Sequence, residues 1–204
     1  MVTNIIELIN EKINDLNGHV FDSRVLRQRG ISDYIENLCC ERIVQLSSSG
    51  MSVSETSSVK SIEDVEIRLG DNHFMVDIKC RDVNKDFSKP NLLSIDKARK
   101  YLKNTLNHII YIFLDYNVVD DTVTIVNISV KPIESLDWSY LSVQNLGKGQ
   151  LQIKSTTTGI FFNDTVTRKE WFDRLVREGK EYYDRLILKV SEYKINWDDD
   201  TKWD

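Results

Sequence analysis

The sequence has few of the residues that build metal centres from nitrogen and sulfur. It contains three cysteines and three histidines in 204 residues. Two of the cysteines, Cys39 and Cys40, are adjacent, so the chain offers neither a disulfide framework nor a CxxC metal motif. The histidines are scattered along the chain, which argues against a zinc site. We therefore expect reduced, mainly structural cysteines.

Long hydrophobic runs are also missing. No apolar run approaches the roughly 18 residues that span a bilayer, and the first residues, MVTNIIELINEK, lack a basic leader and a small-residue cleavage site. These absences predict a cytoplasmic protein that does not enter a membrane. A net charge of −5 argues against a nonspecific nucleic-acid coat protein. It does not exclude a DNA enzyme, because carboxylates around a divalent ion lower the net charge while local basic patches bind phosphate.

The length and the 41% hydrophobic content predict a single globular domain over residues 1–204. Periodicity predicts helices over residues 3–16, 32–46 and 94–106, and a long last helix from residue 168. It predicts strands at 64–69, 73–80, 109–115, 122–131 and 151–154, which together indicate an α/β fold with a mixed sheet. We expect the serine-rich residues 47–61 to form a flexible loop and the acidic tail 197–204 to fray.

Helix caps and faces are visible in the sequence as well. Ser32 and Ser94 are predicted N-caps, and Thr167 with Glu170 forms a capping-box pattern at the start of the last helix. The apolar face of that helix should pack on the sheet, and its members are Trp171, Phe172, Leu175, Tyr182, Leu186 and Val190.

The chemistry-bearing residues gather in a predicted hairpin that turns at residues 70–72. Asp64 and Asp77 would meet at its open end, and strand alternation places Asp77 and Lys79 on one face with Ile78 in the core. Metal-dependent phosphodiester cleavage needs carboxylates that hold hard cations and a positive group that steadies the attacking water. An exposed polar strand face is the alternative interpretation of these residues.

The surrounding segments resemble the PD-(D/E)xK nucleases, and among them the EcoRV-like type II restriction endonucleases that include HincII and SwaI. The resemblance lies in DIKCRDVNKDFSKPN from Asp77, in RGISDYIENL, in QNLGKGQLQIK and in TRKEWFDRL, in the same chain order. Asp64 stands thirteen residues before Asp77, which is the separation that the family uses. Glu63 departs from the pattern, because it occupies the position of the proline in the family name.

The resemblance implies a restriction-endonuclease-like core with flanking helices and gives each residue of the hairpin a role. Asp64, Asp77 and the backbone carbonyl of Ile78 would bind Mg²⁺, for which Mn²⁺ can substitute. Lys79 would orient or activate water. Glu36 is a candidate for an outer contact to the metal, with a solvated helix acid as the alternative. Glu66 is a weaker candidate, because it lies deeper along the strand and can pair with Arg68 or Lys79.

Two further segments are candidates for DNA contact. The loop from Arg81 offers cations for phosphate, and the resemblance places Ser88, Pro90 and Asn91 near the middle of the recognition site. Around residues 147–149, glycine allows close backbone approach and amide side chains can pair with adenine. The alternative there is an ordinary glycine turn. The DNA-contact candidates are Arg81, Lys85, Ser88, Lys89, Asn91, Gln144, Asn145, Lys148 and Gln150.

The favoured function is a Mg²⁺-dependent type II restriction endonuclease that cuts double-stranded DNA at a short palindromic site. A homodimer suits such a site, because its two-fold symmetry matches the palindrome. The resemblance implies blunt ends with 5′-phosphates and a cognate DNA methyltransferase in the host. Two alternatives stay open: a structure-specific repair nuclease or junction resolvase with the same core, and a DNA-binding module without catalysis.

Overall fold

The computed structural model describes residues 1–25, 30–56, 63–85, 90–144, 149–154 and 159–199. The helices are α1 (Val2–Ile13), α2 (Ile31–Val44), α3 (Ile95–Leu102) and α4 (Arg168–Asp199). The strands are β1 (Val20–Asp22), β2 (Met51–Glu55), β3 (Val65–Leu69), β4 (Asn72–Asp82), β5 (Asn91–Ser94), β6 (Asn107–Val119), β7 (Thr122–Pro132), β8 (Leu141–Gln144) and β9 (Gln150–Ile153). In the described part of the chain, no helix is both long enough and apolar enough to cross a membrane.

The main sheet is mixed, with strand order β1-β7-β6-β4-β3-β2. Its central pair, β4 and β6, is parallel, and the other pairs in this sheet are antiparallel. The parallel pair needs a crossover connection, which β5 and α3 provide. This topology confirms the predicted α/β class with a mixed sheet. The predicted hairpin is confirmed too, because β3 pairs with β4 across a turn with Gly70 at φ 56°.

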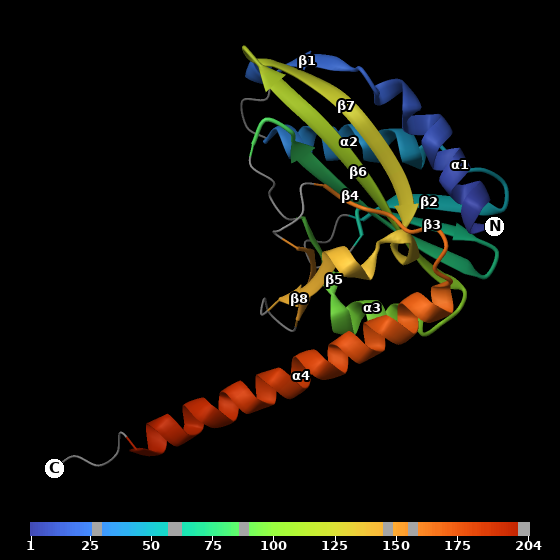
Figure 1. Ribbon diagram of the computed structural model, residues 1–204. Coiled ribbons are helices and arrows are strands. Elements are labelled where there is room, and N and C mark those ends of the chain that lie inside the picture. Colours follow the sequence, from blue (N-terminus) through green and yellow to red (C-terminus); the bar gives the residue numbers. More distant parts are fainter. Residues whose placement is uncertain (26–29, 57–62, 86–89, 145–148, 155–158, 200–204) are drawn as a thin grey trace.

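The central strands are covered on both faces, so their side chains build two separate cores. Even-numbered residues of β4 such as Phe74, Val76 and Ile78 pack against α1 and α2. Odd-numbered residues such as Met75 face the second core, which α3, the small sheet β5-β9-β8 and the start of α4 close. Figure 1 shows the main sheet between these two layers. Asp77 belongs to the odd-numbered face, at the edge of the second core.

The start of α4 is anchored firmly to the body of the protein. The capping box is confirmed: the Glu170 carboxylate accepts from the Thr167 backbone N–H at 2.8 Å, and the Glu170 N–H donates to the Thr167 hydroxyl at 3.3 Å. The Arg168 guanidinium donates at 2.6 to 3.2 Å to four backbone carbonyls at and beyond the end of α3, those of Leu102, Asn104, Thr105 and Asn107. The contact to Leu102 satisfies a carbonyl at the end of α3, and the others join the start of α4 to the turn that leads into β6.

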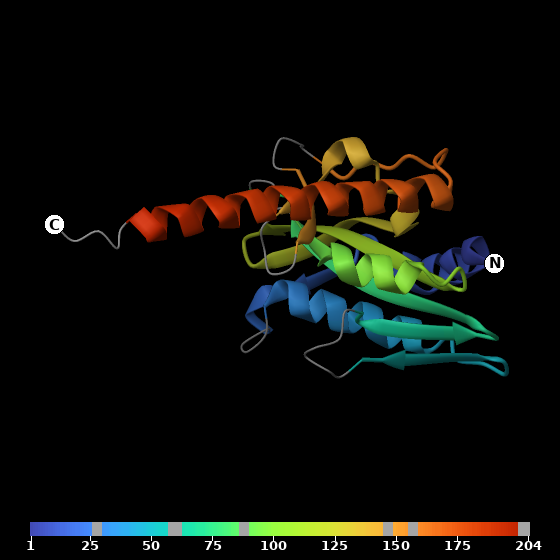
Figure 2. The ribbon, with the colours of Figure 1, turned by 90° about the horizontal axis from the view of Figure 1, so that it is seen from below.

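The predicted packing face of α4 holds only over its first half. Trp171, Leu175 and Tyr182 are buried, whereas Val190 is 57% exposed. The far half of α4 leaves the rest of the molecule (Figures 1 and 2), so the prediction that Val190 packs on the sheet is wrong. The helical period of this segment was predicted correctly, but the body of the protein ends before the helix does.

Three other local predictions need correction. The serine-rich segment contains β2, because Met51 and Val53 alternate inward and pair with β3; residues 57–62 lie outside the described residues. The N-cap of α2 is Gly30 rather than Ser32, whose hydroxyl lies 3.4 Å from the Tyr116 hydroxyl. Residues 197–199 of the predicted acidic tail belong to α4.

Candidate active site

Asp64 and Asp77 lie at the open end of the hairpin, where β3 begins and β4 continues beyond its pairing with β3. Val65 pairs with Val76, and β4 then extends to Asp82 beside β6. Asp64 continues the ladder: its N–H donates to the Val76 carbonyl at 2.9 Å, and its Oδ2 accepts from the Ile78 N–H at 2.7 Å. The N–H and carbonyl of one strand residue point to the same side, so the Ile78 carbonyl also faces this gap. The elements thus bring Asp64, Asp77 and Ile78 to the same end of the hairpin, where the side chains of Asp64 and Asp77 line two different pockets.

Asp77 and Lys79 form a close ion pair on the odd-numbered face of β4. Lys79 Nζ lies 2.8 Å from Oδ1 and 2.7 Å from Oδ2 of Asp77. Asp77 is only 8% exposed, and this burial raises its pKa to about 7 although the Lys79 charge acts in the opposite direction. The pair is therefore a buried, strongly interacting unit, in contrast to the exposed polar strand face that was the alternative interpretation.

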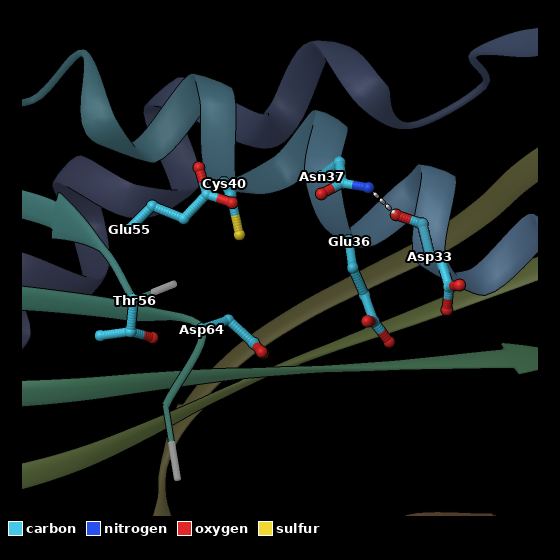
Figure 3. Close-up of a pocket in the computed structure, with 7 residues that line it drawn as sticks. All are labelled: Asp33, Glu36, Asn37, Cys40, Glu55, Thr56 and Asp64. Atoms are coloured by element: carbon cyan, nitrogen blue, oxygen red, sulfur yellow. Dashed lines mark hydrogen bonds between the residues drawn. The ribbon is translucent and has the colours of Figure 1, made fainter. Parts of the chain in front are cut away.

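A pocket of about 300 Å³ lies between α2 and the start of β3 (Figure 3). Asp64 and Glu36 point into it from these two elements, as Figure 3 shows. Burial raises the pKa of Glu36 to about 7, with a further contribution from the Asp64 charge. The structure therefore places Glu36 beside the predicted site. Asp33, Glu55 and Thr56 also line the pocket, and the sequence pattern did not single them out because they come from distant elements.

A second pocket, of about 220 Å³, opens on the opposite side of the hairpin end. Asp77 and Lys79 line it together with Ser94, Lys97 and Gln150. Lys97 was not predicted. Its neighbours in α3 are neutralised, because Arg99 and Lys100 pair with Asp96 at 3.0 and 2.7 Å. Lys97 forms no ion pair with any described residue and is exposed, so this pocket has a free cation beside the Asp77–Lys79 pair.

The donor set suits a hard divalent cation. Within the described residues, no group of three or more histidine, cysteine or carboxylate side chains lies close enough to hold a metal. Mg²⁺ is commonly held by one or two carboxylates, with water and substrate phosphate filling its other positions. Asp64, Asp77 and the Ile78 carbonyl would supply oxygen donors of this kind. The residues therefore fit Mg²⁺ in the chemistry of their donor atoms.

The predicted DNA-contact residues near the end of β4 differ in how available they are to bind phosphate. The Arg81 guanidinium is held by both oxygens of Asp115 at 2.8 Å, so a phosphate would have to compete with this ion pair. Lys85 is 76% exposed and lies 3.3 Å from Asp82. Ser88, Lys89, Asn145 and Lys148 lie outside the described residues.

The amide candidates at the small sheet make contacts within the protein. The Asn91 side chain accepts from the Gln152 amide, and the Gln150 amide donates to the Leu92 carbonyl. Gln144 is exposed, and its amide donates to the Ser142 hydroxyl at 3.0 Å. The bonds of Asn91 and Gln150 join β5 to β9, so base reading by either residue would have to use the side-chain atoms that these bonds leave free.

Gly149 permits a close approach to another part of the protein, whereas the predicted approach to DNA stays a prediction. Its φ is 82°, and a Cβ there would lie 2.8 Å from the Tyr182 ring. The glycine therefore lets β9 sit against α4. It also lets the Gly149 carbonyl accept from the first N–H of α3, that of Ile95, at 2.9 Å.

Comparison with known proteins shows similarity at the level of fold. No protein-family model and no curated protein matches the sequence. The NlaIV restriction endonuclease overlaps 74% of this chain and 67% of its own, with 11% identity and a TM-score of 0.42. Hjc from Archaeoglobus fulgidus, a Holliday junction resolvase, overlaps 56% of this chain and 83% of its own, with 8% identity and a TM-score of 0.32. Both overlaps are partial, so the chemistry must be taken from the residues of this chain.

Proposed function

We propose that this chain is a Mg²⁺-dependent type II restriction endonuclease that hydrolyses double-stranded DNA at a short palindromic site. The observation that supports the proposal is the arrangement at the hairpin end, where Asp64 accepts from the Ile78 N–H at 2.7 Å and the neighbouring Asp77 pairs with Lys79 at 2.7 Å. Two carboxylates, a carbonyl and an ammonium group are the parts that metal-dependent phosphodiester hydrolysis requires. The resemblance adds a homodimer, blunt ends and 5′-phosphates to the proposal, and Mn²⁺ is expected to replace Mg²⁺.

In this mechanism each residue has a distinct task. Asp64, Asp77 and the Ile78 carbonyl would hold Mg²⁺, and the ion would supply charge neutralisation at the phosphate and a more acidic water. Lys79, released from Asp77, orients the attacking water and stabilises the charge that develops on the phosphate. Water adds to phosphorus and the bond to the 3′ oxygen breaks, which leaves a 5′-phosphate and a 3′-hydroxyl. Lys97 binds a neighbouring backbone phosphate in the second pocket.

The decisive experiment is a digest of several sequenced plasmids with Mg²⁺, followed by mapping of the ends by run-off sequencing. Cleavage at one palindromic sequence is expected, and it should fall by several orders of magnitude in Asp64→Asn and in Asp77→Asn. Lys79→Ala should be nearly inactive yet still bind DNA. Glu66→Gln is the matched control, because Glu66 lies in the same hairpin but pairs with Arg68 at 2.5 Å and His73 at 2.6 Å.

The alternatives give different results in the same assay. Preference for mismatched or branched DNA would favour a repair nuclease or resolvase. Full activity in Asp64→Asn would contradict the site, and the absence of metal-dependent cleavage on every DNA would favour a binding module. Staggered ends would contradict the blunt cut. Base reading by the loop that contains Asn145 is tested by Asn145→Ala, which should lose discrimination at one symmetric pair of positions.

A further inference from the structure

The far half of α4 carries large apolar side chains that the protein itself does not cover. Tyr183 is 38% exposed, Ile187 63% and Val190 57%. With Val176, which is partly buried, they lie along one side of the helix at positions 176, 183, 187 and 190. Lys180 and Lys194 complete the series, so the spacing alternates strictly between four and three residues. This is the a/d spacing of a helix that packs against another helix, and we call the six residues the α4 stripe.

The stripe runs into a groove where α4 meets α3. The groove has a volume of about 490 Å³, and its apolar wall includes Ile95, Leu175, Val176 and Tyr183. Gly179 opens its floor, where the nearest side-chain atom to an added Cβ would be 3.4 Å away on Ile95. The first half of α4 thus borders a concave, partly apolar groove. The second half projects beyond the body of the protein (Figure 2) and exposes apolar side chains.

We propose that a second copy of this chain packs its α4 antiparallel along the α4 stripe. The two halves are equal in length, because the groove residues span 175–184 and the exposed stripe continues over 185–194. A two-fold axis near residue 185 would place the projecting half of each copy in the groove of the other. The contact is then the same on both copies, as an isologous dimer requires. At 1.5 Å per residue the shared length is about 30 Å.

The sequence of the stripe favours the antiparallel direction. About residue 185, position 183 faces 187, position 180 faces 190, and position 176 faces 194. Tyr183 then meets Ile187, and each lysine lays its aliphatic stem against a valine of the second copy. In a parallel pair Lys180 would face Lys180 and Lys194 would face Lys194, which repel. Only the antiparallel pair separates these charges.

The charges of the two halves complement one another in the same direction. Residues 175–184 contain two basic and three acidic side chains, which gives −1, whereas residues 185–194 contain three basic and one acidic, which gives +2. Antiparallel packing brings the negative half of one copy to the positive half of the other. A nucleic acid is a poorer occupant, because the exposed side chains at 183, 187 and 190 are uncharged. The inference rests on the homodimer of the proposed function, whose contact surface it names, but it uses none of the site residues.

The first test is the oligomeric state of the full chain without DNA or metal, measured by sedimentation equilibrium. The wild type should be a dimer, and Ile187→Asp or Val190→Asp should each weaken self-association by about 100-fold, because each buries a charge in the apolar contact. Val126→Asp is the matched control, since Val126 is also exposed, at 42%, but lies on β7. Circular dichroism would verify that each variant is folded.

The second test reports the direction of packing. Tyr183→Cys and Ile187→Cys are prepared separately and then mixed under mild oxidation. Antiparallel packing predicts a covalent dimer in the mixture and little in either variant alone. The native thiols Cys39 and Cys40 are buried, and Cys80, which is partly buried, is replaced by serine in both variants. A monomeric wild type, equal effects of Ile187→Asp and Val126→Asp, or cross-linking in each variant alone would overturn the proposal. A cleavage assay plays no part, so failure of the nuclease proposal would not affect the result.

Discussion

Protonation of His108 should make the free energy of unfolding depend on pH. Its ring stacks on Phe74 with centroids 4.9 Å apart, and its Nδ1 lies 2.8 Å from the Arg168 guanidinium. Burial, and then the Arg168 charge, lower its pKa from 6.5 to about 4. Because the folded state resists protonation, His108 favours folding fully above pH 6.5, and this contribution is lost as the pH falls toward 4.

We expect His108→Gln to flatten the decline of unfolding free energy between pH 7 and pH 5. The difference in slope should correspond to about 1 to 2 kcal/mol over that range, and urea unfolding at both pH values would measure it. Other groups titrate there as well, but they are common to both proteins and cancel in the comparison. Identical slopes would show that His108 becomes protonated without cost in the fold.

Lys97 is a residue that we expect to contribute to DNA binding. It faces the pocket of Asp77 and Lys79, whereas Lys100, three residues later in α3, is paired with Asp96. Lys97→Ala should therefore weaken binding to every duplex DNA in EDTA and reduce the salt slope of the binding constant by about 1. Fluorescence anisotropy at several salt concentrations would measure both. Lys100→Ala is the control, and an equal effect in the two variants would contradict a specific role for Lys97.

The site residues differ in how far the sequence could reveal them. Asp64, Asp77 and Lys79 were predictable because they lie within one hairpin, where the two-residue period and the turn fix their relation. Lys97 comes from α3, and Glu36 from α2. The first was missed and the second was only a candidate, because tertiary packing alone decides which side chain of a helix reaches the hairpin end.

Among the elements, α4 depends most on a few contacts near its start. Trp171 is 1% exposed, its indole N–H donates to the Leu136 carbonyl at 2.9 Å, and its ring contacts Trp138. Trp171→Ala would remove both the packing and the hydrogen bond, so we expect a loss of about 3 to 5 kcal/mol in unfolding free energy. Leu188→Ala on the same helix should change it by less than about 0.5 kcal/mol, because Leu188 is 65% exposed. Chemical denaturation would measure both, and similar losses would contradict the burial of Trp171.

The elements also show where local patterns fail. The last helix was predictable because its capping box and apolar period agree. The strand β2 was missed because the serines around it indicated a loop, although Met51 and Val53 alternate as in a strand. Its pairing with β3 outweighs that weak local preference. In the small sheet a strand was predicted only at β9, and the equally short strands β5 and β8 were missed.

For the whole molecule, the arrangement of two cores around one mixed sheet leaves the hairpin end as the place where both layers contribute side chains. The layer of α2 supplies Glu36, and the layer of α3 and the small sheet supplies Lys97 and Gln150. The class of this fold followed from the order of predicted strands and helices. The convergence of the two layers on the hairpin did not, because it depends on the length of β4 beyond β3.

At the hairpin end, the meeting of the two layers gathers several carboxylates in a partly buried position. Their negative charge should lower the stability of the metal-free protein. Burial raises the pKa of Glu36 and of Asp77, and the charge of Asp64 raises both further, because these carboxylates repel one another. Asp64→Asn removes one charge but keeps an oxygen that can accept the Ile78 N–H now bound at 2.7 Å. We therefore expect Asp64→Asn to be more stable than the wild type by about 1 kcal/mol in EDTA, while its cleavage is lost. The difference in stability between Asp64→Asn and the wild type should become smaller with added Mg²⁺, because a cation that binds the folded wild type stabilises it. Thermal unfolding in both conditions would test this, and a lower melting temperature for Asp64→Asn in EDTA would show that the carboxylate supports the fold rather than the chemistry.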